Sequence, residues 1–188
     1  MAAEEKDILL DHLRQSRAAM LDKLDGLSEY DRRRPLTPTG TNLLGLVKHL
    51  AGLEYNYLGD CFDRPAPEKL SWVEDESIWE GADMWATADE SSEYITGLYE
   101  RACAHADQTV ADLDLDTIGY VSWWSEDRRH PTLRRLLVRM VGETARHAGH
   151  ADIVREMIDG SAGDREMLSD EEWQTYVGKV QAAADRFA

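Results

Sequence analysis

Cysteine is scarce in this chain of 188 residues, which contains only Cys61 and Cys103. The two lie far apart and form no Cys-x-x-Cys pair, so the zinc and redox motifs built on paired cysteines are excluded. Two cysteines are also too few for a disulfide framework, and we expect reduced thiols. A chain of this length suits one domain, residues 1–188, with a core large enough to fold without disulfides.

Proline, phenylalanine and long hydrophobic runs are also scarce. Five prolines and two phenylalanines, among many leucines, alanines and charged residues, favour an α-helical protein over a β-sandwich or barrel. No apolar run approaches the ~18 residues of a transmembrane helix. The acidic N-terminus, MAAEEKDILLDHL, lacks the basic and apolar regions of a signal peptide. The sequence therefore predicts a cytoplasmic protein that does not enter a membrane.

Basic residues are outnumbered, with 21 lysines and arginines against 37 acids and a net charge of −16. Such a surface repels phosphate backbones, which argues against nucleic-acid binding. Residues 132–158 are an exception, because they contain five arginines and three acids. This segment could attract a small carboxylate, although arginines more often line a solvated face or pair with neighbouring helices. The five are Arg134, Arg135, Arg139, Arg146 and Arg155.

Hydrophobic periodicity predicts four long amphipathic helices and a shorter final one. They cover about 4–25, 42–59, 88–112, 133–159 and 169–186. This pattern is typical of an all-α fold, a four-helix bundle with a core of about 4–160 and an extra C-terminal helix. The connections 60–86 and 113–130 are long and rich in tryptophan, and we expect them to cover one end of the bundle.

Capping residues set the predicted helix bounds. Thr41 and Thr132 stand where N-caps are expected, and Gly160 stands where the fourth long helix should end. Two pairs have the spacing of a capping box, a hydroxyl residue followed three positions later by glutamate. These pairs are Thr87 with Glu90 and Ser169 with Glu172.

Polar side chains interrupt the apolar stripe of the fourth predicted helix. Glu143, His147 and His150 fall in line with apolar residues such as Met140 and Val154 at 100° per residue. Groups of this kind are costly to bury unless they are paired, hydrogen-bonded or bound to a metal. We therefore consider a metal site beside a simpler explanation, in which these residues are partly buried and joined by hydrogen bonds.

A histidine on the second predicted helix completes the set of candidate metal ligands. His49 adjoins the apolar face of the second predicted helix, while Glu143 and His147 are four residues apart and project together from the fourth. Two imidazoles and a carboxylate match the three protein ligands of a catalytic zinc site, in which the fourth coordination position is left to water or substrate. The same three groups also suit nickel, iron, cobalt or manganese. His150 is a fourth ligand, a neighbour that orients His147, or a residue at the end of the bundle with no part in the site.

Two segments, GTNLLGLVKHLAGLE and LRRLLVRMVGETARHAGHADIVREMIDG, resemble the DinB-like superfamily and in particular its DUF664 branch. The resemblance implies a bundle of the DinB/YfiT type with a divalent metal held by three histidines, one on helix two and two on helix four. His49 and His147 match two of them. Glu143 replaces the third, as in the similar mycothiol-dependent maleylpyruvate isomerase branch. His150 stands where many relatives have glutamine, which implies a role behind the metal ligands.

The same resemblance implies a function. Characterised members use a low-molecular-weight thiol, namely mycothiol, bacillithiol or glutathione, in S-transfer or isomerisation. It thus implies a metal-dependent enzyme, zinc being the first choice, that acts on a small electrophilic substrate and is often a homodimer. The alternative is a non-catalytic metal- or ligand-binding protein of a stress response.

Overall fold

The computed structural model describes residues 2–161 and 168–188. These residues form helices and no β-strand; an isolated bridge joins Ile118 and Thr132. The all-α prediction is therefore confirmed over the described residues. None of the described helices combines the length and the apolar character needed to cross a membrane.

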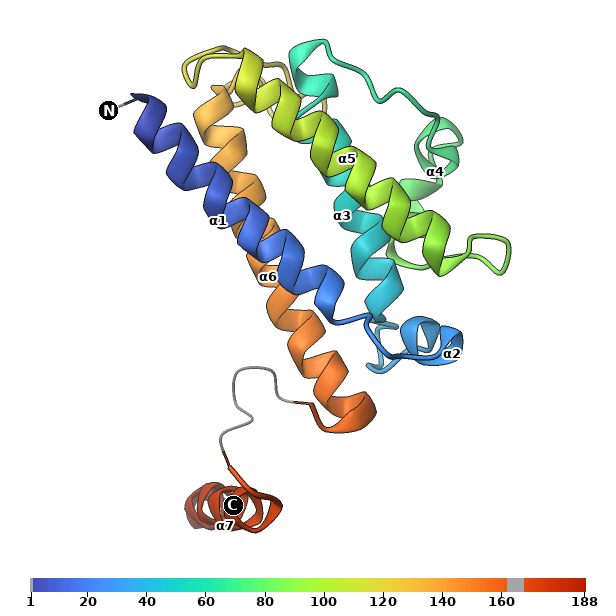
Figure 1. Ribbon diagram of the computed structural model, residues 1–188, viewed down its shortest axis with the longest axis vertical. Helices are drawn as coiled ribbons and strands as arrows, with labels where there is room; N and C mark the ends of the chain where they lie inside the picture. The colour runs from blue at the N-terminus through green and yellow to red at the C-terminus, as the bar shows by residue number, and fades with distance from the viewer. Residues whose placement is uncertain (1, 162–167) are drawn as a thin grey trace.

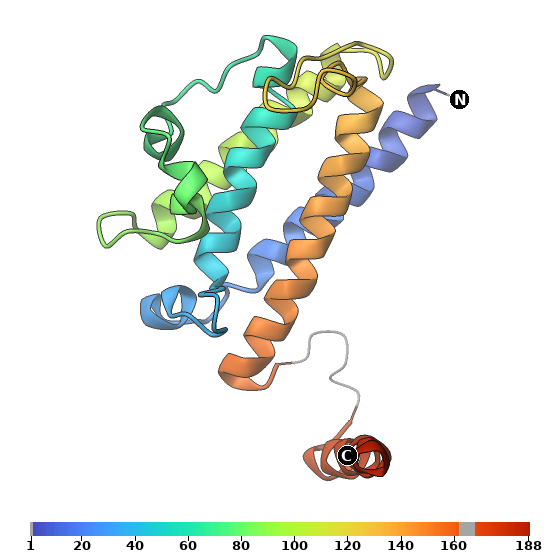
Figure 2. The same cartoon turned by 180° about the vertical axis from the view of Figure 1, so that it is seen from behind.

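Four long helices lie side by side in a bundle (Figures 1 and 2). They are α1 (Ala2–Asp22), α3 (Leu43–Tyr57), α5 (Ser92–Asp112) and α6 (Leu133–Asp159). α3 packs mainly against α5, α1 packs mainly against α6, and α3 also contacts α6. The bundle therefore consists of two helix pairs joined through their inner faces.

Leucine-rich stripes on these helices fill the interior. Side chains from all four helices are fully buried, among them Leu13, Met20, Leu46, Leu50, Ile95, Leu98, Leu136 and Met140. Burying one such side chain stabilises the fold by roughly 1.5–3 kcal/mol, so the aligned stripes account for the bundle.

Two of the predicted N-caps are wrong. α3 is capped by Asn42 and not by Thr41, because the Asn42 side chain accepts a hydrogen bond from the Gly45 amide. α5 begins after Ser91. Glu90 does accept a hydrogen bond from the Thr87 amide, as a capping box requires, but residues 87–90 form a turn and not the first turn of the helix.

The other predicted caps are confirmed. The Thr132 side chain accepts a hydrogen bond from the Arg135 amide, and Gly160 ends α6 in the left-handed region at φ 78°. Ser169 and Glu172 form a complete capping box at the start of α7 (Asp170–Ala184), which leads into the short helix η5 (Asp185–Phe187). Three of the five predicted helix ends are therefore confirmed.

The connections contain short helices. α2 (Glu29–Arg33) follows α1. The connection after α3 contains η1 (Asp60–Phe62), α4 (Ser71–Glu74), η2 (Ser77–Glu80) and η3 (Ala82–Met84). This connection runs down the outside of α3 and α5 (Figure 1). The expectation that both tryptophan-rich connections cover one end of the bundle is therefore wrong for 60–86.

One charged side chain, Arg17 of α1, lies inside the bundle and is only 5% exposed. Its guanidinium donates two hydrogen bonds of 2.7 Å to the fully buried carboxylate of Glu54 on α3. A third hydrogen bond, 2.6 Å long, runs to Asp107 on α5. Arg17 thus connects three helices, and the bidentate geometry is the strongest that an arginine and a carboxylate can form.

We expect Arg17→Met to lower the free energy of unfolding by about 3–5 kcal/mol, because it leaves the buried Glu54 carboxylate without its cation. Urea unfolding at pH 7 measures this loss. Arg14→Gln is the matched control, since Arg14 pairs with the same Asp107 at the surface and should cost less than about 1 kcal/mol.

The double variant Arg17→Met with Glu54→Leu should regain most of the lost stability, because an apolar pair can replace a buried ion pair. A single Arg17→Met variant no less stable than Arg14→Gln would contradict the role given to the buried pair.

Candidate metal centre

Two histidines from different helices face each other between α3 and α6. The ring centroids of His49 on α3 and His147 on α6 are 5.0 Å apart, with the ring planes at 76°. Their side chains are 20% and 13% exposed. Two imidazoles that bind one tetrahedral ion at about 2.0–2.1 Å have ring centres roughly 5 Å apart. The spacing of this pair therefore suits a shared ion.

His49 has a partner that the sequence analysis missed. Its Nδ1 lies 2.6 Å from the Oδ2 atom of Asp83, a nearly buried residue of η3. A carboxylate on one ring nitrogen fixes the orientation of the imidazole and leaves the other nitrogen, Nε2, available. This arrangement is the usual one behind a metal-bound histidine. Asp83 lies in an irregular acidic segment, where no periodic pattern could mark it.

Residues on one face of α3 hold the segment that carries Asp83. The Asn42 side chain donates a hydrogen bond to the Met84 carbonyl at 3.1 Å. Lys48 is 2% exposed; its ammonium donates to the Trp85 carbonyl at 3.1 Å and pairs with Glu90 at 2.8 Å. The backbone of the segment therefore lies directly on the first two turns of α3, next to His49.

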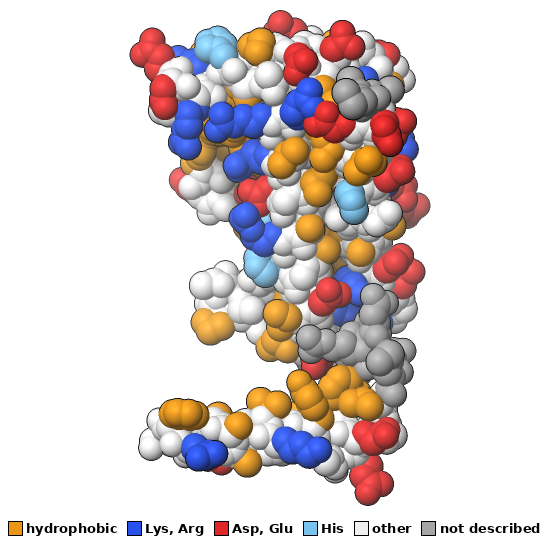
Figure 3. Space-filling model, turned by 90° about the vertical axis from the view of Figure 1, so that its left-hand side faces the viewer, with side chains coloured by type: hydrophobic (Ala, Val, Ile, Leu, Met, Phe, Trp, Pro, Cys, Tyr) orange, Lys and Arg blue, Asp and Glu red, His pale blue; other side chains and the backbone are white. Residues whose placement is uncertain are grey.

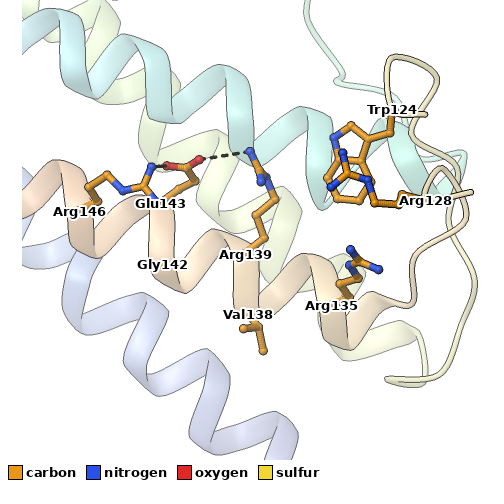
Figure 4. A pocket seen from close by; sticks show the side chains of 8 residues that line it. All are labelled: Trp124, Arg128, Arg135, Val138, Arg139, Gly142, Glu143 and Arg146. Atoms are coloured by element: carbon orange, nitrogen blue, oxygen red, sulfur yellow. Dashed lines mark hydrogen bonds and ion pairs between the residues drawn. The ribbon is translucent and has the colours of Figure 1, made fainter.

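Glu143 lies beside His147 but is bound to arginines. Its Oε2 atom is 4.0 Å from His147 Nε2, and its two oxygens accept hydrogen bonds of 3.2 Å from Arg139 and Arg146 (Figure 4). Within residues 2–161 and 168–188, no three His, Cys, Asp or Glu side chains are grouped closely enough to hold a metal. Glu143 would have to turn toward the two imidazoles to act as a ligand.

His150 lies on the outer side of His147 and is exposed. The two Nδ1 atoms are 3.4 Å apart, whereas Glu143 approaches the other nitrogen, Nε2. An imidazole bound through one nitrogen cannot share its ion with a group at the opposite nitrogen. In this arrangement, therefore, Glu143 and His150 cannot both join His147 on one ion.

The apolar stripe of α6 is displaced from the one expected. The buried residues along its second half are Thr144, Ala148, Ala151 and Val154. Glu143 and His147 lie at the margin of this stripe, and Met157, three residues beyond Val154, is 54% exposed. A marginal position gives both polar groups access to solvent, so their cost is lower than that of full burial.

The pKa of His147 is lowered from 6.5 to about 4. Burial is the largest cause, and the imidazole of His49 adds to it; Glu143 opposes the shift. His147 is therefore neutral at pH 7, which is the form of histidine that binds metals.

A pocket adjoins Glu143 on the side away from the histidine pair. Its volume is about 400 Å³, and its lining includes Arg139, Glu143 and Arg146 of α6 together with Trp124 from the connection before that helix (Figure 4). Glu143 is thus part of both the pocket wall and the group of polar residues around His147.

The bundle and its histidine pair define a protein of the DinB-like class. Residues 8–160 match the model of the mycothiol-S-transferase family, and the chain belongs to that family. The matched segment runs from α1 to the end of α6 and excludes α7.

The chain is also similar to a solved structure, that of a conserved protein from Enterococcus faecalis. The two share 14% sequence identity with a TM-score of 0.64, and the similarity covers 82% of this chain and 97% of the other. At this identity the likeness concerns the fold alone. No match was found among the curated proteins.

We expect Gly45→Ala to destabilise the protein by about 1–3 kcal/mol, because the site has no room for a methyl group. A Cβ at Gly45 would lie 1.9 Å from the Met84 carbonyl oxygen, so the backbone next to Asp83 would have to move. Urea unfolding measures the change. Gly52→Ala is the matched control on the same helix: its Cβ meets nothing closer than 3.6 Å, and it should be neutral or stabilise by up to ~1 kcal/mol. Equal effects of the two variants would contradict the close approach.

We expect the metal-free protein to lose part of its stability as the pH falls from about 6.5 towards 4. The unfolded chain protonates His147 near its ordinary pKa of 6.5, whereas the folded protein does so only near 4. Protons in this window therefore favour the unfolded state, and the contribution is complete above pH 6.5. Urea unfolding between pH 4 and 7 should show a smaller pH-dependent loss in His147→Gln than in the wild-type protein. Parallel curves would contradict the lowered pKa.

Proposed function

We propose that this protein joins mycothiol, through its thiol sulfur, to a small electrophile, with a divalent metal held by His49, Glu143 and His147. The match of residues 8–160 to the mycothiol-S-transferase family is the observation that carries the proposal. The facing imidazoles support a metal, because they come from separate helices and have the ring spacing that one ion requires.

The residues around the pair have distinct tasks in this proposal. Asp83 accepts a hydrogen bond from His49 Nδ1 and so keeps Nε2 available. His147 is neutral and ready to donate its lone pair. Glu143 exchanges one arginine contact for the ion. Zinc is the first choice, and nickel, iron, cobalt or manganese suit the same three groups.

A bound dication would lower the pKa of the substrate thiol and so supply a thiolate nucleophile near neutral pH. The chain's own cysteines do not offer one, because burial raises the pKa of Cys61 to about 12 and also raises that of Cys103. The nucleophile is therefore assigned to the low-molecular-weight thiol and not to a protein thiol.

The non-catalytic alternative requires a coordination sphere closed by the protein, with His150 as the fourth ligand. His150 is exposed and lies at the opposite nitrogen of His147 from Glu143. This arrangement favours an open position for substrate over a closed structural site.

The test is a conjugation assay with monochlorobimane as the electrophile. Protein stripped of metal and reloaded with zinc, nickel, iron, cobalt or manganese is incubated with mycothiol, and separately with bacillithiol or glutathione. We expect mycothiol conjugation that depends on the metal and falls to background in His147→Ala. Asp83→Asn should weaken metal binding by about 10–100-fold, as changes behind a metal ligand typically do.

Metal retention after gel filtration supplies the control. Glu143→Gln should weaken retention, because it removes charge with little change in volume, whereas His150→Gln should have a milder effect. If His150→Gln lost metal as completely as His147→Ala, Glu143 would not be the third ligand. If no thiol were conjugated above the His147→Ala background with any metal, the proposed transfer would be wrong.

A further inference from the structure

The pocket beside Glu143 is rich in arginine. Its wall includes Trp124 and Arg128 from the connection before α6 and Arg135, Arg139, Glu143 and Arg146 from α6 itself (Figure 4). At 100° per residue, the three arginines of α6 lie within roughly 40° of one line along the helix. The volume, about 400 Å³, is within the range of sites for small molecules.

The charge of this pocket is opposite to that of the chain as a whole. Four arginines and one glutamate line it, whereas the chain has a net charge of −16. Figure 3 shows lysine and arginine side chains gathered on one part of a surface that elsewhere has many acidic groups. A concave site lined by one sign of charge concentrates ligands of the opposite sign.

Two of the four guanidinium groups have no ion pair with another described residue. Arg139 and Arg146 bind Glu143, but Arg128 donates a hydrogen bond to the Ser125 hydroxyl at 3.3 Å, and Arg135 lies over the Trp124 ring at 5.7 Å. The exposed carboxylate of Asp127 is near enough to interact with both through solvent. The end of the pocket away from His147 therefore offers guanidinium donors to a ligand.

Aromatic rings hold two of the arginines of the pocket, Arg135 over Trp124 and Arg139 over both Tyr57 and Trp124. The Arg139 guanidinium lies 4.8 Å from the Tyr57 ring centroid and 5.6 Å from that of Trp124. An arginine stacked on an aromatic ring is held in place while the edge of its guanidinium group stays free to bind a carboxylate. The pocket is thus organised before a ligand enters.

We propose that this pocket binds a carboxylate of the electrophilic substrate, so that the substrate class is a small organic acid. The inference rests on the proposed function, because it assigns the second substrate of that transfer. Mycothiol does not suit the arginines: its cysteine is amide-linked to an amino sugar, so it is a neutral polyol with no carboxylate. A planar carboxylate instead matches the two parallel donors of a guanidinium group.

Glu143 lies between the pocket and the histidine pair. Arg139 and His147 are separated by about 12 Å along the axis of α6, a little over two turns. Glu143 lies between them and contacts Arg139 at 3.2 Å. The pocket lining runs from Arg128 and Arg135 at one end to Glu143 and Arg146 at the other, so an acid bound in the pocket lies next to Glu143.

Isothermal titration calorimetry on the metal-free, thiol-free protein at low salt tests the proposal with succinate as the probe. Succinamide is the uncharged match of the same shape, and inorganic phosphate is a second anion. We expect succinate to bind, succinamide not to bind, and Arg135→Gln to weaken succinate binding by about tenfold, as the loss of a charge-assisted contact does.

Two further variants separate binding in the pocket from general attraction. Gly142→Leu fills the pocket without changing charge, since a Cβ there meets nothing within 4 Å, and it should weaken succinate binding while leaving the helix folded. Arg134→Gln is the matched charge control, because Arg134 is on the same helix but pairs with Glu5 and Asp116. It should leave succinate binding unchanged.

The proposal is overturned if Arg134→Gln weakens succinate as much as Arg135→Gln does, or if Gly142→Leu has no effect. It is also overturned if phosphate binds the pocket more tightly than succinate. Because no metal or thiol is present, the result is independent of the conjugation assay. Conjugation without succinate binding would refute this pocket assignment alone, and succinate binding without conjugation would refute the transfer alone.

Discussion

Arg17 determines how the two helix pairs of the bundle fit together. The α3–α5 pair and the α1–α6 pair each have an apolar seam, but hydrophobic contacts alone are not directional. The guanidinium of Arg17 binds Glu54 of α3 through two hydrogen bonds and Asp107 of α5 through a third. A buried bidentate pair has one acceptable geometry, so α1 is fixed in rotation and height against α3. Since α6 packs on α1, this constraint also positions α6 relative to α3, and hence His147 relative to His49.

α3 then serves as the base on which the candidate site is assembled. Successive turns carry Asn42, Gly45 and Lys48, which hold the irregular segment 82–90, and the next residue is His49. Asp83 lies within hydrogen-bond distance of His49 because the backbone of this segment packs closely against Gly45. The orientation of one imidazole thus depends on a glycine a full turn earlier, whose role is purely steric.

The sequence predicts the parts of this protein that repeat along a helix. Periodicity and caps locate the four long helices, and the same periodicity puts His49 and His147 on inward faces of two of them. The buried ion pair of Arg17 could not be predicted in this way, because its partner Glu54 lies on another helix and no sequence spacing relates the two residues. Asp83 lies in a segment without periodicity, so nothing in the sequence links it to His49. The spacing of Glu143 predicts a partner of the histidines, but the same i, i+3 and i, i+4 spacing also brings Arg139 and Arg146 to it.

Glu143 lines the pocket and also lies beside His147, which has a thermodynamic consequence for the proposed metal site and the proposed carboxylate site. Its carboxylate is bound to Arg139 and Arg146 and is 4.0 Å from His147. If it turns to hold a cation with the two imidazoles, it releases guanidinium donors to the pocket. If a substrate carboxylate bound at Arg128 and Arg135 also takes a donor from Arg139 or Arg146, Glu143 is freed for the cation. Either event favours the other, and linkage requires the two effects on binding free energy to be equal. A glutamate shared in this way makes each of the two ligands bind more tightly when the other is present, whereas a histidine at position 143 would have no carboxylate to exchange between the two sites.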